Sequence, residues 1–180
     1  MTVKPLPVHG VDLSHNNMSV DLQEAKTAGL QFVYHKATQG RHFDDVLYVE
    51  RRKDANRLGL PFGAYHFCES TSSPEEQMAH FLRVANAQPG DMRPMIDVED
   101  YAAGHSFFSK MSIEARSDWV MRAVQEIENA LGMTPFIYTP YDLTDTFGCP
   151  LWVARYSNTN ALPNIPEPWD VYALRQFSDE

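Results

Sequence analysis

Two carboxylic acids lie two positions apart in the stretch RPMIDVED, residues 93–100. In an extended strand, side chains alternate between faces, so Asp97 and Glu99 share one face with their Cα atoms roughly 6.6 Å apart. Neighbouring carboxyls in a dry setting resist double ionisation, which keeps one as an acid and the other as a base. The spacing therefore suits proton-transfer chemistry, and the alternative is a strand end that dips into solvent.

The elements that must position these acids are apolar, strand-like runs that alternate with helical patterns. Ser73-Pro74 with Glu76, and Ser112 before a long helix, are typical helix starts, and Gly29, Gly59 and Gly132 are typical ends. The predicted helices are 19–29, 44–58, 74–87 and 112–131. The predicted strands are 8–13, 32–37, 61–67, 94–99, 135–139, 151–156 and 171–177.

Strand, helix and strand repeated in this way predict an α/β fold with a parallel sheet. The second half departs from the pattern, because only a short turn fits 140–149 and a Pro/Asn-rich loop occupies 157–170. We predict one domain over residues 1–180, an irregular (β/α) TIM-like barrel with reduced or missing helices in its C-terminal half. An open doubly wound sheet is the alternative.

In such folds the chemistry gathers at the carboxyl ends of the strands. Polar and aromatic residues interrupt the apolar pattern at six of the predicted strand ends. They are Asp12 on the first strand, Tyr65 and His66 on the third, Asp97 and Glu99 on the fourth, Tyr138 on the fifth, Arg155 and Tyr156 on the sixth, and Gln176 on the seventh.

Composition excludes several classes of function. The 15 Lys and Arg against 24 Asp and Glu give a net charge of −9, which argues against a nucleic-acid partner. No apolar run approaches the roughly 20 residues of a membrane span, and the amino terminus lacks the pattern of a secretion signal.

The cysteines and the short motifs predict little further chemistry. Cys68 follows one predicted strand and Cys149 precedes another, so we expect two unpaired thiols. No HExxH, CxxC or G-x-S-x-G motif is present, so we expect neither a metal or other cofactor nor a serine nucleophile.

The ordered blocks HGVDLSHNN, FVYHKATQG, GLPFGAYHF, PMIDVED, TPFIYT and LWVARY resemble glycoside hydrolase family 25 muramidases, the Chalaropsis-type lysozymes. The resemblance implies hydrolysis of the β-1,4 bond between N-acetylmuramic acid and N-acetylglucosamine in peptidoglycan. It assigns Glu99 as general acid, Asp97 as its neighbouring carboxylate and Asp12 as a third acid. It also places Tyr65, Tyr138 and Trp152 along the sugar groove.

Further sugar contacts are predicted at Lys36, Arg155 and Gln176, although Lys36 is as well explained as an ordinary strand-end lysine. The family carries one more aspartate about a dozen residues after the segment matched by QFS, residues 176–178, so we expect the last strand to be incomplete. N-acetyl sugars supply their own nucleophile in some enzymes with a D-x-E pair. We expect that route here, with Glu99 as acid and then base and Asp97 orienting the acetamido group.

Two other functions compete with a wall lysin. A carbohydrate-binding or scaffold protein would keep the barrel without catalysis, and a chitinase-like enzyme would carry a longer D-x-x-D-x-D-x-E run. A lysin without a signal peptide would stay cytoplasmic until released, as in bacteriophage, or be delivered by a particle. Because an acidic domain is repelled by anionic wall polymers, a separate wall-binding module or oligomerisation would help targeting.

Three residues, His66, Trp119 and Trp169, also have a purely structural interpretation. We expect His66 to be packed with a satisfied hydrogen bond while Tyr65 faces the groove, and Trp119 to belong to the core. Trp169, in the Pro-rich loop, is equally compatible with sugar stacking and with anchoring the loop.

Overall fold

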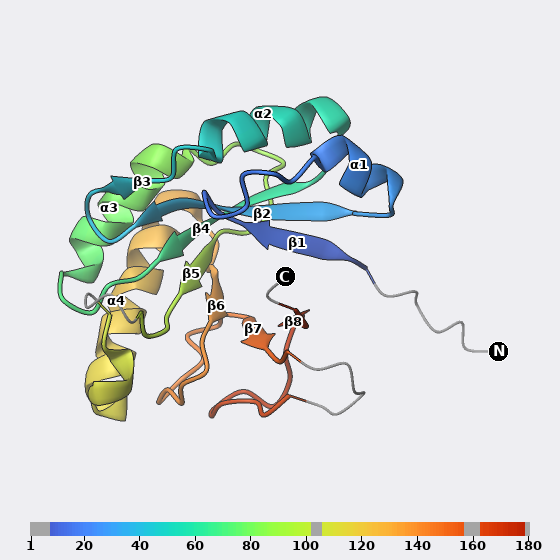
Figure 1. The fold of residues 1–180 in the computed structure, drawn as a ribbon. Helices are drawn as coiled ribbons and strands as arrows, with labels where there is room; N and C mark the ends of the chain where they lie inside the picture. Colours follow the sequence, from blue (N-terminus) through green and yellow to red (C-terminus); the bar gives the residue numbers. More distant parts are fainter. Residues whose placement is uncertain (1–7, 102–105, 157–162, 179–180) are drawn as a thin grey trace.

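The computed structural model describes residues 8–101, 106–156 and 163–178, and its centre is one curled sheet (Figure 1). The strand order is β1-β2-β4-β5-β6-β7-β8 with every pair parallel, and β3 pairs antiparallel with β2. The strands are β1 (Gly10–Leu13), β2 (Phe32–Gln39), β3 (Phe43–Asp44), β4 (Phe62–Phe67), β5 (Met95–Asp97), β6 (Phe136–Tyr138), β7 (Leu151–Ala154) and β8 (Leu174–Gln176).

Helices cover the outer face of the first part of this sheet (Figure 1). They are α1 (Leu22–Thr27), α2 (Tyr48–Leu58), α3 (Pro74–Ala85) and α4 (Ile113–Leu131), with a short 3-10 helix η1 (Phe108–Lys110). Between β6 and β8 the described residues form turns and contain no helix. The strand order never reverses, so the structure confirms a (β/α) barrel-like fold with reduced helices and not a doubly wound sheet. Residues 157–162 of the predicted loop lie outside the described residues.

Helix boundaries follow the capping signals of the sequence. The Ser73 hydroxyl accepts a hydrogen bond from the Glu76 N–H, and Ser112 accepts one from Ala115 N–H. Each such cap stabilises its helix by about 1 kcal/mol. Gly59 and Gly132 end α2 and α4 in the left-handed conformation, with φ of 65° and 68°. The predicted helix ends were therefore correct to within a few residues.

The two faces of the sheet carry two separate apolar clusters. The outer cluster packs the sheet against the helices and includes Ile96 and Val98. The inner cluster, on the concave face, consists of Tyr34, Tyr65, Met95, Tyr138 and Trp152. Because Ile96 and Val98 lie on the outer face, Asp97 between them faces inward, as the alternation predicts.

A β-bulge in β2 shifts the pairing of this strand with β4 by one residue. Lys36 pairs with Tyr65 of β4, whereas Thr38 pairs with His66, so Ala37 is an extra residue. The Thr38 hydroxyl lies 2.7 Å from Nδ1 of His66, and Oε1 of Gln77 lies 3.0 Å from its Nε2. Burial lowers the pKa of His66 to about 3, so the ring is neutral at pH 7. The prediction of a packed, satisfied His66 is confirmed.

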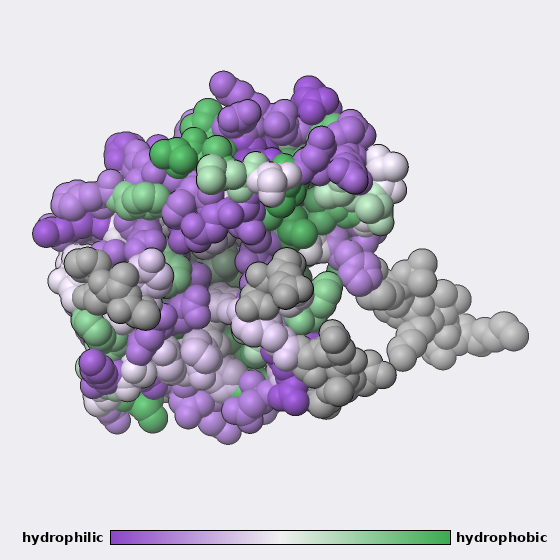
Figure 2. Space-filling view, viewed as in Figure 1, coloured by the Kyte–Doolittle hydropathy of each residue, from purple (hydrophilic) through white to green (hydrophobic). Residues whose placement is uncertain are grey.

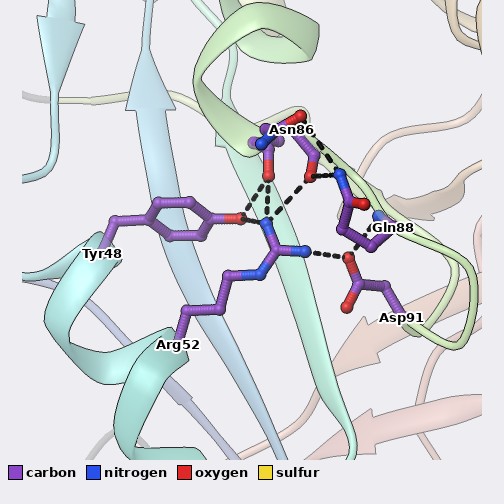
Figure 3. Close-up of polar contacts among 6 residues, drawn as sticks. Tyr48, Arg52, Asn86, Gln88 and Asp91 are labelled. Carbon is purple, nitrogen blue, oxygen red and sulfur yellow. Dashed lines mark hydrogen bonds and ion pairs between the residues drawn. The ribbon is translucent and has the colours of Figure 1, made fainter. Parts of the chain in front are cut away.

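Arg52 of α2 fixes the connection from α3 to β5 (Figure 3). Its guanidinium donates to the carbonyl oxygens of Ala85 and Asn86, at 2.5 and 3.0 Å, and pairs with the carboxylate of Asp91. Tyr48 donates its hydroxyl to the same Ala85 carbonyl at 2.9 Å. A guanidinium offers five donors in a rigid fork, so a single side chain can hold this turn and with it the start of β5.

Both cysteines, Trp119 and Trp169 are buried. Cys68 and Cys149 are free thiols, which confirms the prediction. Trp119 packs in the core, and Trp169 donates its indole N–H to the carbonyl of Cys149 at 2.9 Å, so it anchors its loop. None of the described helices has the length and apolar content to cross a membrane.

The surface seen in Figure 2 is mainly hydrophilic, with apolar side chains gathered over β3 and the start of α2. Phe43, Val46 and Val49 of that region are exposed. The ring of His15 lies against Phe43, at 5.2 Å between centroids, and its Nδ1 is 2.8 Å from the buried carboxylate of Asp45. These contacts hold the loop that follows β1.

Candidate active site

The acids expected from the sequence lie together on the inner face, at the carboxyl ends of the strands. Asp97 ends β5 and is in register with Tyr138 of β6, which is in register with Trp152 of β7. Glu99 lies two residues beyond the end of β5, not inside the strand as predicted. The amide of Val98 still bonds to the carbonyl of Tyr138 at 2.8 Å, so the extended path continues to Glu99.

Asp97 is the most enclosed of the acids. Only 7% of its surface is exposed, and its Oδ1 has no hydrogen-bond partner among the described residues. Burial raises the pKa of Asp97 well above its usual range, and the charge of Glu99 raises it further, while Lys36 opposes both effects. Asp97 therefore tends to hold a proton as long as Glu99 is charged.

Glu99 is half-buried and electrostatically coupled to the same groups. Burial raises its pKa, the ammonium group of Lys36 lowers it, and the charges of Asp12 and Asp100 raise it. The Ser106 hydroxyl donates to the Glu99 carbonyl at 2.6 Å and so holds the backbone. The next carboxylate, Asp100, is exposed and accepts hydrogen bonds from Ser109, which makes it part of the loop structure.

Lys36 supplies a buried positive charge near the acids. Only 8% of the surface of Lys36 is exposed. Its Nζ lies 4.9 Å from the ring centroid of Phe67 and 5.9 Å from that of Tyr65. Burial lowers the pKa of Lys36, whereas the charges of Asp97 and Glu99 raise it. An ammonium ion over two aromatic faces is a stable arrangement in a dry site.

Asp12 is held from the far end of the sheet. The side-chain amide of Gln176 on β8 donates to both Asp12 oxygens, at 2.9 and 3.1 Å. The same amide accepts hydrogen bonds from the hydroxyls of Tyr138 and Tyr156, at 2.9 and 3.1 Å. Burial raises the pKa of Asp12 to about 6, while hydrogen bonds from its own backbone and from Gln176 lower it.

The predicted aromatic sugar contacts Tyr65, Tyr138 and Trp152 are at most 7% exposed and belong to the inner cluster. A sugar contact at these positions stays a prediction. Tyr101 is a more exposed aromatic residue near the acids, at 47%, and its ring makes a T-shaped contact with Phe67 at 5.8 Å between centroids. Its place two residues after Glu99 is the sequence signal for it.

Arg155 is less well placed than the other predicted contacts. It follows the end of β7, two positions after Val153, whose side chain packs in the outer cluster. Its amide donates to the carbonyl of Gln176 at 2.8 Å, which continues the pairing of β7 with β8. A sugar contact at Arg155 stays a prediction.

This arrangement can perform acid and base catalysis. Two coupled carboxyls share a partly desolvated site that raises the pKa of both, while the charges of Asp12 and Lys36 raise and lower these pKa values respectively. A proton donor next to a carboxylate is the pair that cleavage of a glycosidic bond needs. No group of three or more His, Cys, Asp or Glu side chains within the described residues is arranged to hold a metal ion.

Comparison with known sequences gives one consistent family. The profile of Glycosyl hydrolases family 25 matches residues 11–180. The autolytic lysozyme of Clostridium acetobutylicum is 30% identical over 94% of this chain and 50% of its own length. The N,O-diacetylmuramidase of Arthroderma benhamiae is 28% identical over 96% of this chain and 77% of its own. The chain thus spans only about half the length of the Clostridium relative.

Solved structures give the same result. A family GH25 lysozyme from Aspergillus fumigatus matches with a TM-score of 0.83 and 29% identity, over 94% of this chain and 87% of that one. A bacterial lysozyme from Streptomyces coelicolor has a TM-score of 0.86 at 23% identity, over 97% and 85%, and so supports the fold alone.

Proposed function

Because the chain belongs to glycosyl hydrolase family 25, we propose that it is a lysozyme, a muramidase that hydrolyses bacterial peptidoglycan. The bond cleaved is the β-1,4 bond between N-acetylmuramic acid and N-acetylglucosamine, and the site of action is the bacterial cell wall. The observation that carries the proposal is the coupled pair Asp97 and Glu99 at the end of β5, with Lys36 and Asp12 beside it.

Glu99 is the general acid of the proposed reaction. Of the pair it is the less buried, so its carboxyl can reach a sugar bound outside the sheet. Burial raises its pKa, which favours the protonated form that can donate to the leaving oxygen of the glycosidic bond. After departure of the first sugar, the resulting carboxylate takes a proton from the attacking water.

Asp97, the more buried acid, assists the proposed reaction by binding the substrate. Its unpartnered Oδ1 is an acceptor that can bind the N–H of a substrate acetamido group. Holding that group turns its carbonyl oxygen toward the anomeric carbon. The oxygen forms a new bond to that carbon as the bond to the leaving sugar breaks, and the leaving oxygen takes the proton of Glu99. As Glu99 loses its proton, the negative charge of the pair also stabilises the developing oxocarbenium ion.

Lysis of a peptidoglycan suspension by the wild type and by Glu99→Gln tests the proposal. We expect the variant to lose at least about 100-fold in rate, because a positioned general acid contributes that much. Glu128→Gln, the same change on the exposed face of α4, is the control and should lyse like wild type. A wild type that binds peptidoglycan without lysing it would instead identify a carbohydrate-binding protein.

The same digestion, followed by NMR, gives the anomeric configuration of the first product. Participation of the acetamido group inverts the anomeric carbon twice, so we expect retention. An inverted first product would exclude this route and assign a base role to Asp97 or Asp12.

A further inference from the structure

Gln176 joins the two ends of the sheet through its side chain. β1 and β8 stand at opposite ends of the strand order, and no ladder pairs them within the described residues. Gln176 and Asp12 are 164 positions apart in sequence, yet the amide nitrogen contacts both carboxylate oxygens. The curl of the sheet in Figure 1 brings these ends together.

The hydrogen bonds fix the direction of this amide. A carboxylate accepts hydrogen bonds only, so the –NH₂ group of Gln176 must face Asp12. The amide oxygen then faces the other way, where it accepts from the hydroxyls of Tyr138 and Tyr156, at 2.9 and 3.1 Å. A reversed amide could still donate to the two phenol oxygens, but it would set its own oxygen against the Asp12 carboxylate, so Asp12 is the group that fixes the direction.

The fixed amide determines what Tyr138 offers a substrate. A phenol has one proton, and Tyr138 donates its proton to Gln176. With its proton engaged in this way, Tyr138 can accept a hydrogen bond from a sugar hydroxyl or amide. The Tyr156 hydroxyl donates to the same oxygen and lies 3.5 Å from the Tyr138 hydroxyl, a contact in which either can be the donor.

The amide also acts on the charge of Asp12. Burial raises the pKa of Asp12 to about 6, and the hydrogen bond from Gln176 works in the opposite direction. The ionisable groups near Asp12 are Asp97 at the end of β5, Glu99 beyond it and Tyr65 on β4. Tyr138 of β6 and Tyr156 contact the same Gln176 amide. The two acids disfavour a charge on Asp12, so the donor from β8 opposes them.

We propose that Gln176 is a positioning residue, not a sugar contact, which keeps Asp12 ionised and aims the Tyr138 hydroxyl through one oriented amide. β8 thus contributes to the active site by way of residues on β1 and β6. The expected effect on kcat rests on the proposed function. The expected effect on the Asp12 titration rests on the hydrogen-bond geometry alone.

Two substitutions separate this role from packing. Gln176→Glu keeps shape and keeps an acceptor for both tyrosines, but it sets a second carboxyl against Asp12, so the pair resists double ionisation and Asp12 no longer faces a neutral donor. Gln176→Met keeps the length and removes both polar contacts. Gln125→Glu makes the same amide-to-carboxylate change on the exposed face of α4 and is the control.

The titration of Asp12, followed by carbon NMR of its labelled carboxyl, is the direct readout and needs no activity. We expect its midpoint to rise in the order wild type, Gln176→Met, Gln176→Glu, and to stay unchanged in Gln125→Glu. An Asp12 midpoint that is the same in wild type and in both Gln176 variants would overturn the proposal. The thermal unfolding of each variant shows which are folded, and either folded variant suffices for the test.

The kinetic readout completes the experiment. We expect kcat of Gln176→Glu on peptidoglycan to fall on the order of 10-fold or more with KM nearly unchanged, and the acidic limb of its pH profile to move to higher pH. Loss of a sugar contact would raise KM instead, which would contradict the proposal. A wild type without lytic activity would overturn the proposed function alone, because the Asp12 titration still tests the role of Gln176.

Discussion

At the scale of single residues, the site works through the balance of one buried positive charge against three acids. Lys36 lies over Phe67 and Tyr65 and lowers the pKa of both Asp97 and Glu99. Under the proposed activity the active form of such a pair holds a single proton, so the lysine would set the pH range of lysis. Its contacts with two aromatic rings explain why an ammonium group tolerates burial there.

Lys36→Met should therefore move the pH profile of lysis upward. The charge of Lys36 lowers the pKa of both carboxyls, so its removal raises both, and the range with one proton on the pair moves to higher pH. The measurement is kcat/KM against pH for wild type and variant. Lys53→Met, an exposed change on α2, is the control, and an unchanged or downward-shifted profile for Lys36→Met would refute this role.

At the scale of elements, β4 depends on a glycine that leaves room for an aromatic ring. A Cβ added at Gly63 would lie 2.3 Å from Cε1 of Tyr34 on β2. Tyr34 is fully buried and donates its hydroxyl to the carbonyl of Arg93 at 2.7 Å, so its ring has little freedom to move. The glycine in G-x-Y-H-F is thus explained by close packing of neighbouring strands.

Gly63→Ala should cost about 1 to 3 kcal/mol of unfolding free energy, the usual cost of overpacking a core. Urea unfolding measures it. In a Tyr34→Leu background the same substitution should cost much less, because the clashing ring atoms are gone. Equal costs in both backgrounds would show that the strain lies elsewhere.

The sequence predicted most elements because their signals are local. Ser73, Ser112, Gly59 and Gly132 define helix ends by themselves, and the alternation around Ile96 and Val98 assigns the faces of β5. Long-range geometry has no such signal. The bulge at Ala37 and the bond between Gln176 and Asp12 depend on how distant strands meet, so the sequence predicts neither.

At the scale of the whole molecule, the acids of the site reduce the stability of the fold at neutral pH. The pKa of Asp12 is raised by burial from 3.8 to about 6. The folded protein therefore binds this proton more tightly than the unfolded chain does. The corresponding stability is present below about pH 4 and is lost as the pH rises through about 6, a difference of about 3 kcal/mol.

Asp12→Asn should remove that loss. Since asparagine does not ionise, we expect the variant to gain up to about 3 kcal/mol relative to wild type on going from pH 4 to pH 7. Urea unfolding at the two pH values measures it, with Asp170→Asn on the surface as the control. A stability difference between variant and wild type that is the same at both pH values would contradict a strained carboxylate at Asp12.

The inner cluster described above also limits how a polymer can meet this protein. Five side chains fill the inner face of the sheet next to the acids: Tyr34, Tyr65, Met95, Tyr138 and Trp152. The interior of the curled sheet is therefore a packed core and not a channel. A glycan strand cannot be threaded through it from a loose end and has to be laid across the opening. Under the proposed activity, such a shape favours cuts at interior positions of long strands, which is what a cross-linked mesh with few free ends requires.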